Sequence, residues 1–121
     1  MKPSRQAHKP YQLFVLRYVP NPVVGEFINF GVILVEKSGF AGARFCDLNR
    51  ITRLDPRADV EVLQGVENEI RDRLKDSHGR EIMLHTFTDS LSNLIQISQP
   101  VGCFTNDPER ELELLAHMYL T

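Results

Sequence analysis

Two apolar segments joined by a short turn constrain this chain more than any other feature. Residues 11–19 read YQLFVLRYV and residues 27–36 read FINFGVILVE, so both segments are rich in β-branched and aromatic side chains. Apolar residues occupy both alternating faces of the first segment, which is typical of a strand that is covered on two sides or central in its sheet. Between them, PNPVVGE at residues 20–26 ends the first strand and lets the chain turn back. We therefore expect a β-hairpin.

A third strand follows the hairpin. Residues 36–42 read EKSGFAG and contain a Ser38-Gly39 turn signal, after which GARFC at residues 42–46 resumes a short strand. Three consecutive strands with brief loops favour an antiparallel meander.

The middle of the chain predicts one amphipathic helix. DLNRITRLDP at residues 47–56 is interpreted as irregular or as a single helical turn. Asp55-Pro56 then supplies an N-cap followed by proline at the first helical position, with Asp59 as a later alternative cap. The helix should end before His78-Gly79 and should cover one face of the sheet. Its apolar positions recur at spacings of three and four residues: Leu63, Val66, Ile70 and Leu74.

The last third of the chain predicts a short helix through Leu91, a strand within NLIQIS at residues 93–98, and turn or extended chain over residues 99–107. Asp107-Pro108 repeats the cap-and-proline signal, so a closing helix should begin there. Its apolar stripe holds Leu112, Leu115 and Tyr119, with Leu114 and Met118 alongside. The expected fold class is α+β: an antiparallel sheet led by a three-stranded meander, with about three helices packed on it.

Length and composition limit the classes of function. The chain has 121 residues and a formal net charge of -2, so residues 10–121 are expected to form a single domain after a flexible basic tail at residues 1–9. Without a cluster of basic residues, nucleic-acid binding is not expected. The start of the chain has no apolar leader, and only two cysteines are present, which favours a cytoplasmic protein. The longest apolar run, FGVILV, is too short to span a membrane.

The familiar catalytic and metal-binding patterns are not found in the sequence. The four histidines form no paired ligand motif with one another or with Cys46 and Cys103, and we expect the two cysteines to pack in the core. The glycines lie around strands and turns and do not open a helix, so no phosphate-binding motif is present. We predict no metal and no cofactor.

The sharper signal is a set of polar residues in the hairpin. We expect a register in which Tyr11 faces Val35. The same register places Arg17 opposite Asn29, with Glu26 nearby at the end of the turn. One interpretation is a structural cluster in which Arg17 pairs with Glu26. The other is a contact with a ligand or a partner.

Gly31 fits either interpretation of the hairpin. A glycine inside a strand weakens it, so its presence indicates a β-bulge or the close approach of another body.

These residues also carry a resemblance. YQLFVLRYVPNPVVGEFINFGVILVEKSGF at residues 11–40, followed by ARF, resembles the opening of the bacterial family known as domain of unknown function 3037 (DUF3037), which shares Gly-Glu-Phe-x-Asn-x-Gly-Val. NLIQIS and DPERELELL resemble its weaker ending, so the likeness spans most of residues 10–120. Many relatives have a basic residue before Gly-Glu, where this chain has Val24. By position, the shared residues are Arg17, Pro20, Gly25, Glu26, Asn29 and Gly31.

Three functions are weighed from these observations. The first is a non-enzymatic protein-interaction or accessory subunit. The resemblance implies a HipA-like kinase as its partner, in a toxin-antitoxin or defence-like module. The second is a small hydrolase or nuclease with Glu26 as base or metal ligand and Arg17 stabilising negative charge, which a concave pocket holding Glu26 with Asp47 or His85 would favour. The third is nucleic-acid binding through the basic tail. The oligomeric state is not determined by the sequence.

Overall fold

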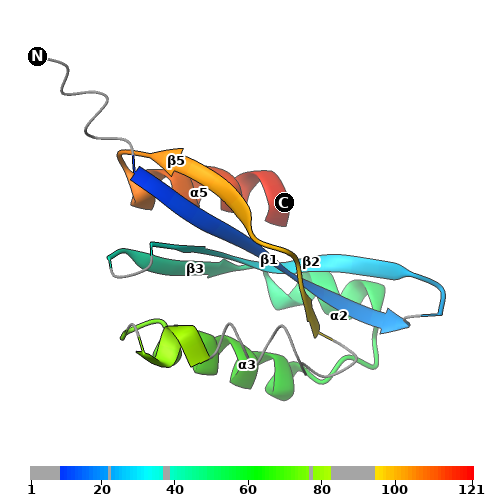
Figure 1. Ribbon diagram of the computed structural model, residues 1–121. Coiled ribbons are helices and arrows are strands. Elements are labelled where there is room, and N and C mark those ends of the chain that lie inside the picture. Colours follow the sequence, from blue (N-terminus) through cyan, green and yellow to red (C-terminus); the bar gives the residue numbers. More distant parts are fainter. Residues whose placement is uncertain (1–8, 22, 37–38, 77, 83–94) are drawn as a thin grey trace, which may run out of the picture.

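The structure is a computed structural model that describes residues 9–21, 23–36, 39–76, 78–82 and 95–121. It has the predicted α+β architecture, an antiparallel sheet of five strands with helices packed on it (Figure 1). The helices are α2 (Leu48–Leu54), α3 (Val60–Arg73) and α5 (Pro108–Leu120), and residues 78–82 are helical as well. The strands are β1 (Lys9–Asn21), β2 (Glu26–Val35), β3 (Ala41–Phe45), β4 (Ile95–Ile97) and β5 (Val101–Thr105).

Strand β1 organises the sheet. The order β3-β2-β1 confirms the predicted meander, and both β4 and β5 pair with the other edge of β1. The 13 residues of β1 provide enough length for this, because β5 pairs with residues 9–13 and β4 with residues 16–18. Between these two strands, Ser98 continues the hydrogen bonding along β1. Its backbone N–H donates to Val15 O, and its side-chain Oγ accepts from Val15 N, both at 2.9 Å. The long strand therefore holds two short ones in line.

The C-terminal strands test the expectations for residues 81–107. Strand β4 confirms the strand predicted within NLIQIS. Residues 99–107, expected as turn and extended chain, contain β5, whose pairing with β1 was not foreseen. Residues 81 and 82, where the helix expected through Leu91 would begin, are helical, and its remaining residues lie outside the described part of the chain.

Helices lie on both faces of the sheet, with α5 on one side and α3 on the other (Figure 1). Neighbouring residues of β3 reach these opposite helices: Arg44 forms an ion pair with Glu113 of α5, whereas the guanidinium of Arg71 in α3 lies 4.9 Å from the centroid of the Phe45 ring. Successive side chains of a strand point to opposite faces, so both layers contribute to one core. All four side chains of residues 13–16 in β1 are consequently buried.

Helix α3 does not begin at Asp55-Pro56, which the sequence favoured as its start. Residues 47–56 are not irregular, because α2 occupies most of them and Asp47 caps it by accepting from Asn49 N at 2.9 Å. Asp55 is the C-cap of α2 and not the N-cap of α3, so that prediction is wrong. The alternative is confirmed, since Asp59 caps α3 by accepting from Val62 N at 3.2 Å. The Asp55 carboxylate accepts hydrogen bonds from other groups, which are described below.

The apolar stripes of the helices are mostly as predicted. Helix α3 ends at Arg73, before His78 as predicted. Leu63, Ile70 and Leu74 of the expected stripe are buried. Asp107 caps α5 by accepting from Arg110 N at 3.2 Å. The expected width of the α5 stripe is wrong: Leu112 and Leu115 are buried and Tyr119 is half-buried, but Leu114 and Met118 are exposed. Over the described residues, no helix has both the length and the apolar character that crossing a membrane requires.

The hairpin register contains a β-bulge. Gln12 pairs with Val35, and this register continues to Leu16 opposite Gly31. The next pair is Arg17 with Asn29, so Phe30 is an extra residue on β2. The predicted pair of Tyr11 with Val35 is therefore wrong by one residue, while Arg17 opposite Asn29 is confirmed. The bulge absorbs the difference between these two registers.

Phe45 explains why glycine follows the bulged residue. The rings of Phe30 and Phe45 lie 5.3 Å apart, and a Cβ built on Gly31 would come within 2.7 Å of Phe45 Cδ1 and 3.1 Å of Arg44 O. Gly31 thus adjoins a β-bulge, which was one of the two expectations for it. It is also closely approached, but by β3 of the same chain and not by another body.

Arg80 joins the meander to the end of α3, a role that sequence reasoning did not foresee. Its side chain is buried, and Nη1 donates to Glu36 O at 2.9 Å and Gly39 O at 3.2 Å. Nη2 donates to Leu74 O at 3.0 Å. One guanidinium therefore satisfies carbonyl groups of the β2–β3 turn and of the α3 C-terminus.

Replacing Gly31 by alanine should destabilise the fold. The added methyl group would overlap the Phe45 ring and crowd a backbone carbonyl, so we expect the free energy of unfolding to fall by about 1–3 kcal/mol. Urea denaturation measures the change.

Gly65→Ala is the matched control, because its Cβ would meet no atom within 4 Å on the exposed side of α3. This variant should gain about 0.5–1 kcal/mol from helix propensity. Equal stability of Gly31→Ala and the wild type would contradict the close contact with Phe45.

Candidate functional site

The predicted polar residues lie at the end of the β1–β2 hairpin. Asn21 and Glu26 form the last Cα pair before the turn. Gly25 has φ +81°, a left-handed conformation that glycine adopts without strain, so the turn requires glycine at this position. The turn projects beyond the helices at one end of the sheet (Figure 1).

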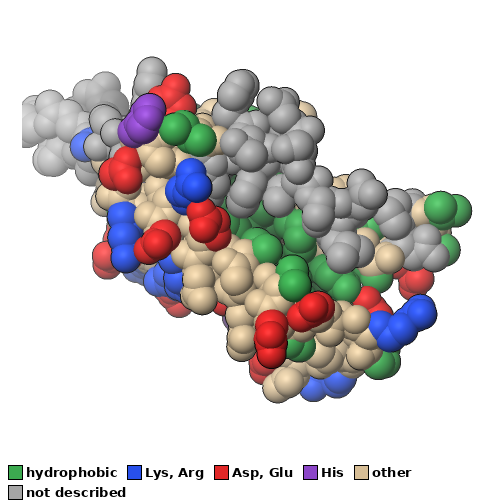
Figure 2. Space-filling view, turned by 90° about the horizontal axis from the view of Figure 1, so that it is seen from below, with side chains coloured by type: hydrophobic (Ala, Val, Ile, Leu, Met, Phe, Trp, Pro, Cys, Tyr) green, Lys and Arg blue, Asp and Glu red, His purple; other side chains and the backbone are tan. Residues whose placement is uncertain are grey.

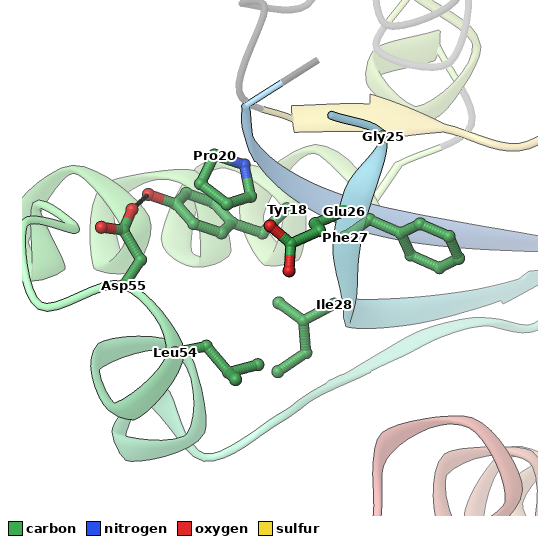
Figure 3. Close-up of a pocket in the computed structure, with 8 residues that line it drawn as sticks. All are labelled: Tyr18, Pro20, Gly25, Glu26, Phe27, Ile28, Leu54 and Asp55. Atoms are coloured by element: carbon green, nitrogen blue, oxygen red, sulfur yellow. Dashed lines mark hydrogen bonds between the residues drawn. The ribbon is translucent and has the colours of Figure 1, made fainter. Parts of the chain in front are cut away.

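A cavity of about 360 Å³ opens beside this turn. The end of β1, the start of β2 and the end of α2 form its walls (Figure 3). The Glu26 carboxylate points into the cavity, with Ile28 and Leu54 facing each other below it, whereas the Phe27 ring points away. The lining residues are Tyr18, Pro20, Gly25, Glu26, Phe27, Ile28, Leu54 and Asp55.

A hydrogen bond between Tyr18 and Asp55 forms the far wall of the cavity. The buried Tyr18 hydroxyl donates to Asp55 Oδ2 at 2.7 Å, and Asp55 Oδ1 accepts from Arg57 N at 3.2 Å. Burial, the hydrogen bond and the negative charge of Asp55 raise the pKa of Tyr18 to about 12. Both oxygens of Asp55 thus serve the fold: Oδ2 ties the end of α2 to β1, and Oδ1 holds the turn that follows α2.

Glu26 differs from Asp55 in its surroundings. It is exposed, and none of the four ion pairs found among the described residues includes it. Its carboxylate therefore points into the cavity without a described cationic partner.

Arg17 and Asn29 lie on the other side of the hairpin. Because Asn29 and Glu26 are three residues apart on β2, their side chains point to opposite faces. Asn29 Nδ2 donates to Tyr119 O of α5 at 3.0 Å. The guanidinium of Arg17 lies 4.7 Å from the Phe27 ring centroid, and its buried Nε has no hydrogen-bond partner among the residues that the structure describes.

The predicted cluster is therefore divided. The structure brings Arg17 beside Asn29, but it places Glu26 with Pro20 and Gly25 at the cavity. An ion pair of Arg17 with Glu26 is not found in the part of the chain that the structure describes. Gly31 lies farther along β2, at the bulge.

Sequence reasoning missed Tyr18, Leu54 and Asp55 as cavity residues. Tyr18 was assigned to a strand and Asp55 to a helix cap, and Leu54 carried no signal beyond its hydrophobicity. Only the folded position of Leu54, exposed beside the hairpin, makes it informative.

Exposed apolar side chains lie at the hairpin turn, next to it on β2, and on the α2 wall of the cavity. Val23 is 94% exposed, Val24 60%, Phe27 52% and Leu54 71%. Viewed from the α3 side, hydrophobic side chains gather in the middle of the surface and again at its right-hand end, and many charged side chains lie toward the opposite end (Figure 2). We use the name hairpin-end surface for the cavity together with the four exposed residues Val23, Val24, Phe27 and Leu54.

No group of three or more His, Cys, Asp or Glu side chains suited to a metal ion occurs among the described residues. Asp47, named with Glu26 for an enzyme site, caps α2 and does not line the cavity, and His85 lies outside the described residues. The basic tail at residues 1–9 is described only at Lys9.

Residues 13–120 match the model of a family described as protein of unknown function (DUF3037). The match covers nearly the whole chain, so the protein belongs to this family, as the resemblance of the hairpin indicated. No curated protein and no solved structure matches the chain.

The Tyr18 hydrogen bond predicts a pH dependence of stability. Its pKa is raised from 10.0 to about 12 in the folded protein, so the stabilisation is complete below pH 10 and is lost as pH rises from 10 to 12. Tyr18→Phe should be less stable than the wild type by about 0.5–1.5 kcal/mol at neutral pH. Urea unfolding at pH 9, 10.5 and 11.5 should show a smaller decline for the variant. Parallel declines would contradict the assignment.

Proposed function

We propose that the protein is a non-enzymatic accessory subunit that binds another protein through the hairpin-end surface. The observation that carries this proposal is the exposure of four large apolar side chains at one end of the sheet, which also holds a cavity of about 360 Å³. Clustered exposed apolar side chains next to a concave site are typical of binding surfaces. A partner that covers them would remove their apolar area from water and bury the cavity.

The construction of the hairpin end supports a binding role. Its walls are fixed by the Tyr18–Asp55 hydrogen bond and by the Gly25 turn, so the surface is largely formed before a partner arrives. A preformed surface loses less conformational entropy on association, which favours affinity.

The partner we propose is a protein with a HipA-like kinase fold, in a toxin-antitoxin or defence-like module. Membership of the DUF3037 family supports this choice, because the resemblance implies that members are often encoded beside such proteins. The proposal can be tested directly with any HipA-like protein that is encoded next to this chain in its native genome.

Leu54→Ala should weaken capture of this partner. The substitution removes most of an apolar side chain from the wall of the cavity without changing its charge, and we expect affinity to fall by at least about tenfold, as for an interface hot spot. Co-purification of the two proteins followed by calorimetry measures the effect, and circular dichroism checks that the variant folds.

Leu114→Ala provides the control, because Leu114 is also exposed, at 52%, but lies on α5 away from the hairpin. It should bind like the wild type. Equal affinity of both variants would remove the hairpin end from consideration, and failure to capture the kinase-like protein at all would reject that partner.

One observation favours a second candidate, a small hydrolase or nuclease. Glu26 lies in a concave cavity that also contains the Asp55 carboxylate, and a glutamate in such a position could serve as general base. Against this role, both oxygens of Asp55 are already used by Tyr18 and Arg57.

Assays with activated esters, phosphodiesters, DNA and RNA, each with and without Mg²⁺, would test the enzyme. Its prediction is hydrolysis by the wild type that Glu26→Gln reduces by at least about 100-fold. Hydrolysis that survives this substitution would reject Glu26 as the base.

A further inference from the structure

We propose that the cavity at the hairpin end receives a lysine or arginine side chain of the protein partner. This inference rests on the proposed function, because it specifies the chemistry of the partner at the same surface.

Charge is the first argument. Among the described residues that line the cavity, Glu26 and Asp55 are charged and none is basic. Hydrogen bonds from Tyr18 O–H and Arg57 N–H orient the Asp55 carboxylate without cancelling its charge. Neither carboxylate takes part in an ion pair among the described residues. The cavity therefore complements a cation and disfavours an anion.

The apolar part of the lining is the second argument. Pro20, Ile28 and Leu54 lie beside the Glu26 carboxylate (Figure 3). Lysine and arginine side chains place their methylene stem along apolar surface while the charged head meets polar groups. A purely apolar side chain would leave the carboxylates without a counter-charge, and a bare metal ion would make no use of the apolar wall.

Size is the third argument. A volume of about 360 Å³ lies near the lower end of the range for small-molecule pockets, which suits one side chain better than a large cofactor. The depression beside the N-terminus of α5 is larger, about 630 Å³, but its lining mixes Arg110 with Asp107 and Glu111 and selects no sign of charge.

The test uses three matched probes and the full-length protein. Nα-acetyl-lysine amide and Nα-acetyl-arginine amide carry the proposed head groups, and Nα-acetyl-norleucine amide has an apolar chain without the charge. Titrations followed by ¹H–¹⁵N NMR would monitor the amides of Gly25 and Glu26, with Gly102 of β5 as a distant reference.

We expect at least one basic probe to bind at least about fivefold more tightly than the norleucine probe, with shifts confined to the hairpin end. Added salt should weaken this difference, because it screens exposed charges. Glu26→Gln should lower the affinity of the basic probe to that of norleucine. Glu109→Gln, which changes the same charge on exposed α5, should leave it unchanged.

Three outcomes would overturn the inference: equal binding of the basic and norleucine probes, retention of the preference in Glu26→Gln, or loss of it in Glu109→Gln. Putrescine binding about tenfold more tightly than both basic probes would replace the partner side chain by a soluble polyamine, and so would also overturn it.

These results are distinguishable from failure of the proposed function. Capture of a partner that depends on Leu54, without any preference for the basic probes, would reject only the basic side chain. A clear preference for a basic probe, with no protein partner bound, would reject only the accessory subunit.

Discussion

The bulge at Phe30, one of two register irregularities in the central hairpin, sets how β1, β2 and β3 pack together. The bulge changes the register between β1 and β2, so that Asn29 faces α5 and bonds to Tyr119 O. Strand alternation then directs Glu26 to the opposite side, where the cavity lies. Phe30 also packs against Phe45, and glycine at position 31 allows β3 to approach. Core packing and the orientation of the site thus depend on the same local irregularity.

The hairpin end becomes a site because the core does not cover it. Strands β1 and β2 are enclosed by helices along most of their length, but the turn extends past them (Figure 1). The end of α2 reaches this region and is held there by the bond from Tyr18 to Asp55. Leu54 is thereby placed beside the turn while remaining exposed. A rigid scaffold carrying an exposed loop is a common arrangement for recognition.

The hairpin-end surface combines exposed apolar side chains with the carboxylate of Glu26. Large exposed apolar side chains favour burial by a partner, whereas Glu26 requires a counter-charge when it is desolvated. A basic side chain with an aliphatic stem meets both requirements. Arg17, stacked on Phe27 across the hairpin, adds a cation on the other face, so a partner that surrounds the hairpin end would encounter opposite charges on its two sides.

Local patterns in the sequence were sufficient for the meander, the cap at Asp107 and the buried stripe of α3, because each depends on residues close in the chain. The predicted register was right at one of its two pairs. Arg17 lies opposite Asn29 as expected, but counting one residue for one along both strands led to the wrong pair, Tyr11 with Val35. The extra residue in β2, Phe30, depends on packing against Phe45, which lies far away in the sequence. Likewise, Asp55 carries a cap pattern, yet the Tyr18 hydroxyl, 37 residues away, takes its carboxylate. The amino-acid sequence by itself thus determined which residues form the hairpin and which are polar. Only the tertiary structure decided which of them meet, because strand alternation and long-range contacts assign each side chain to a face.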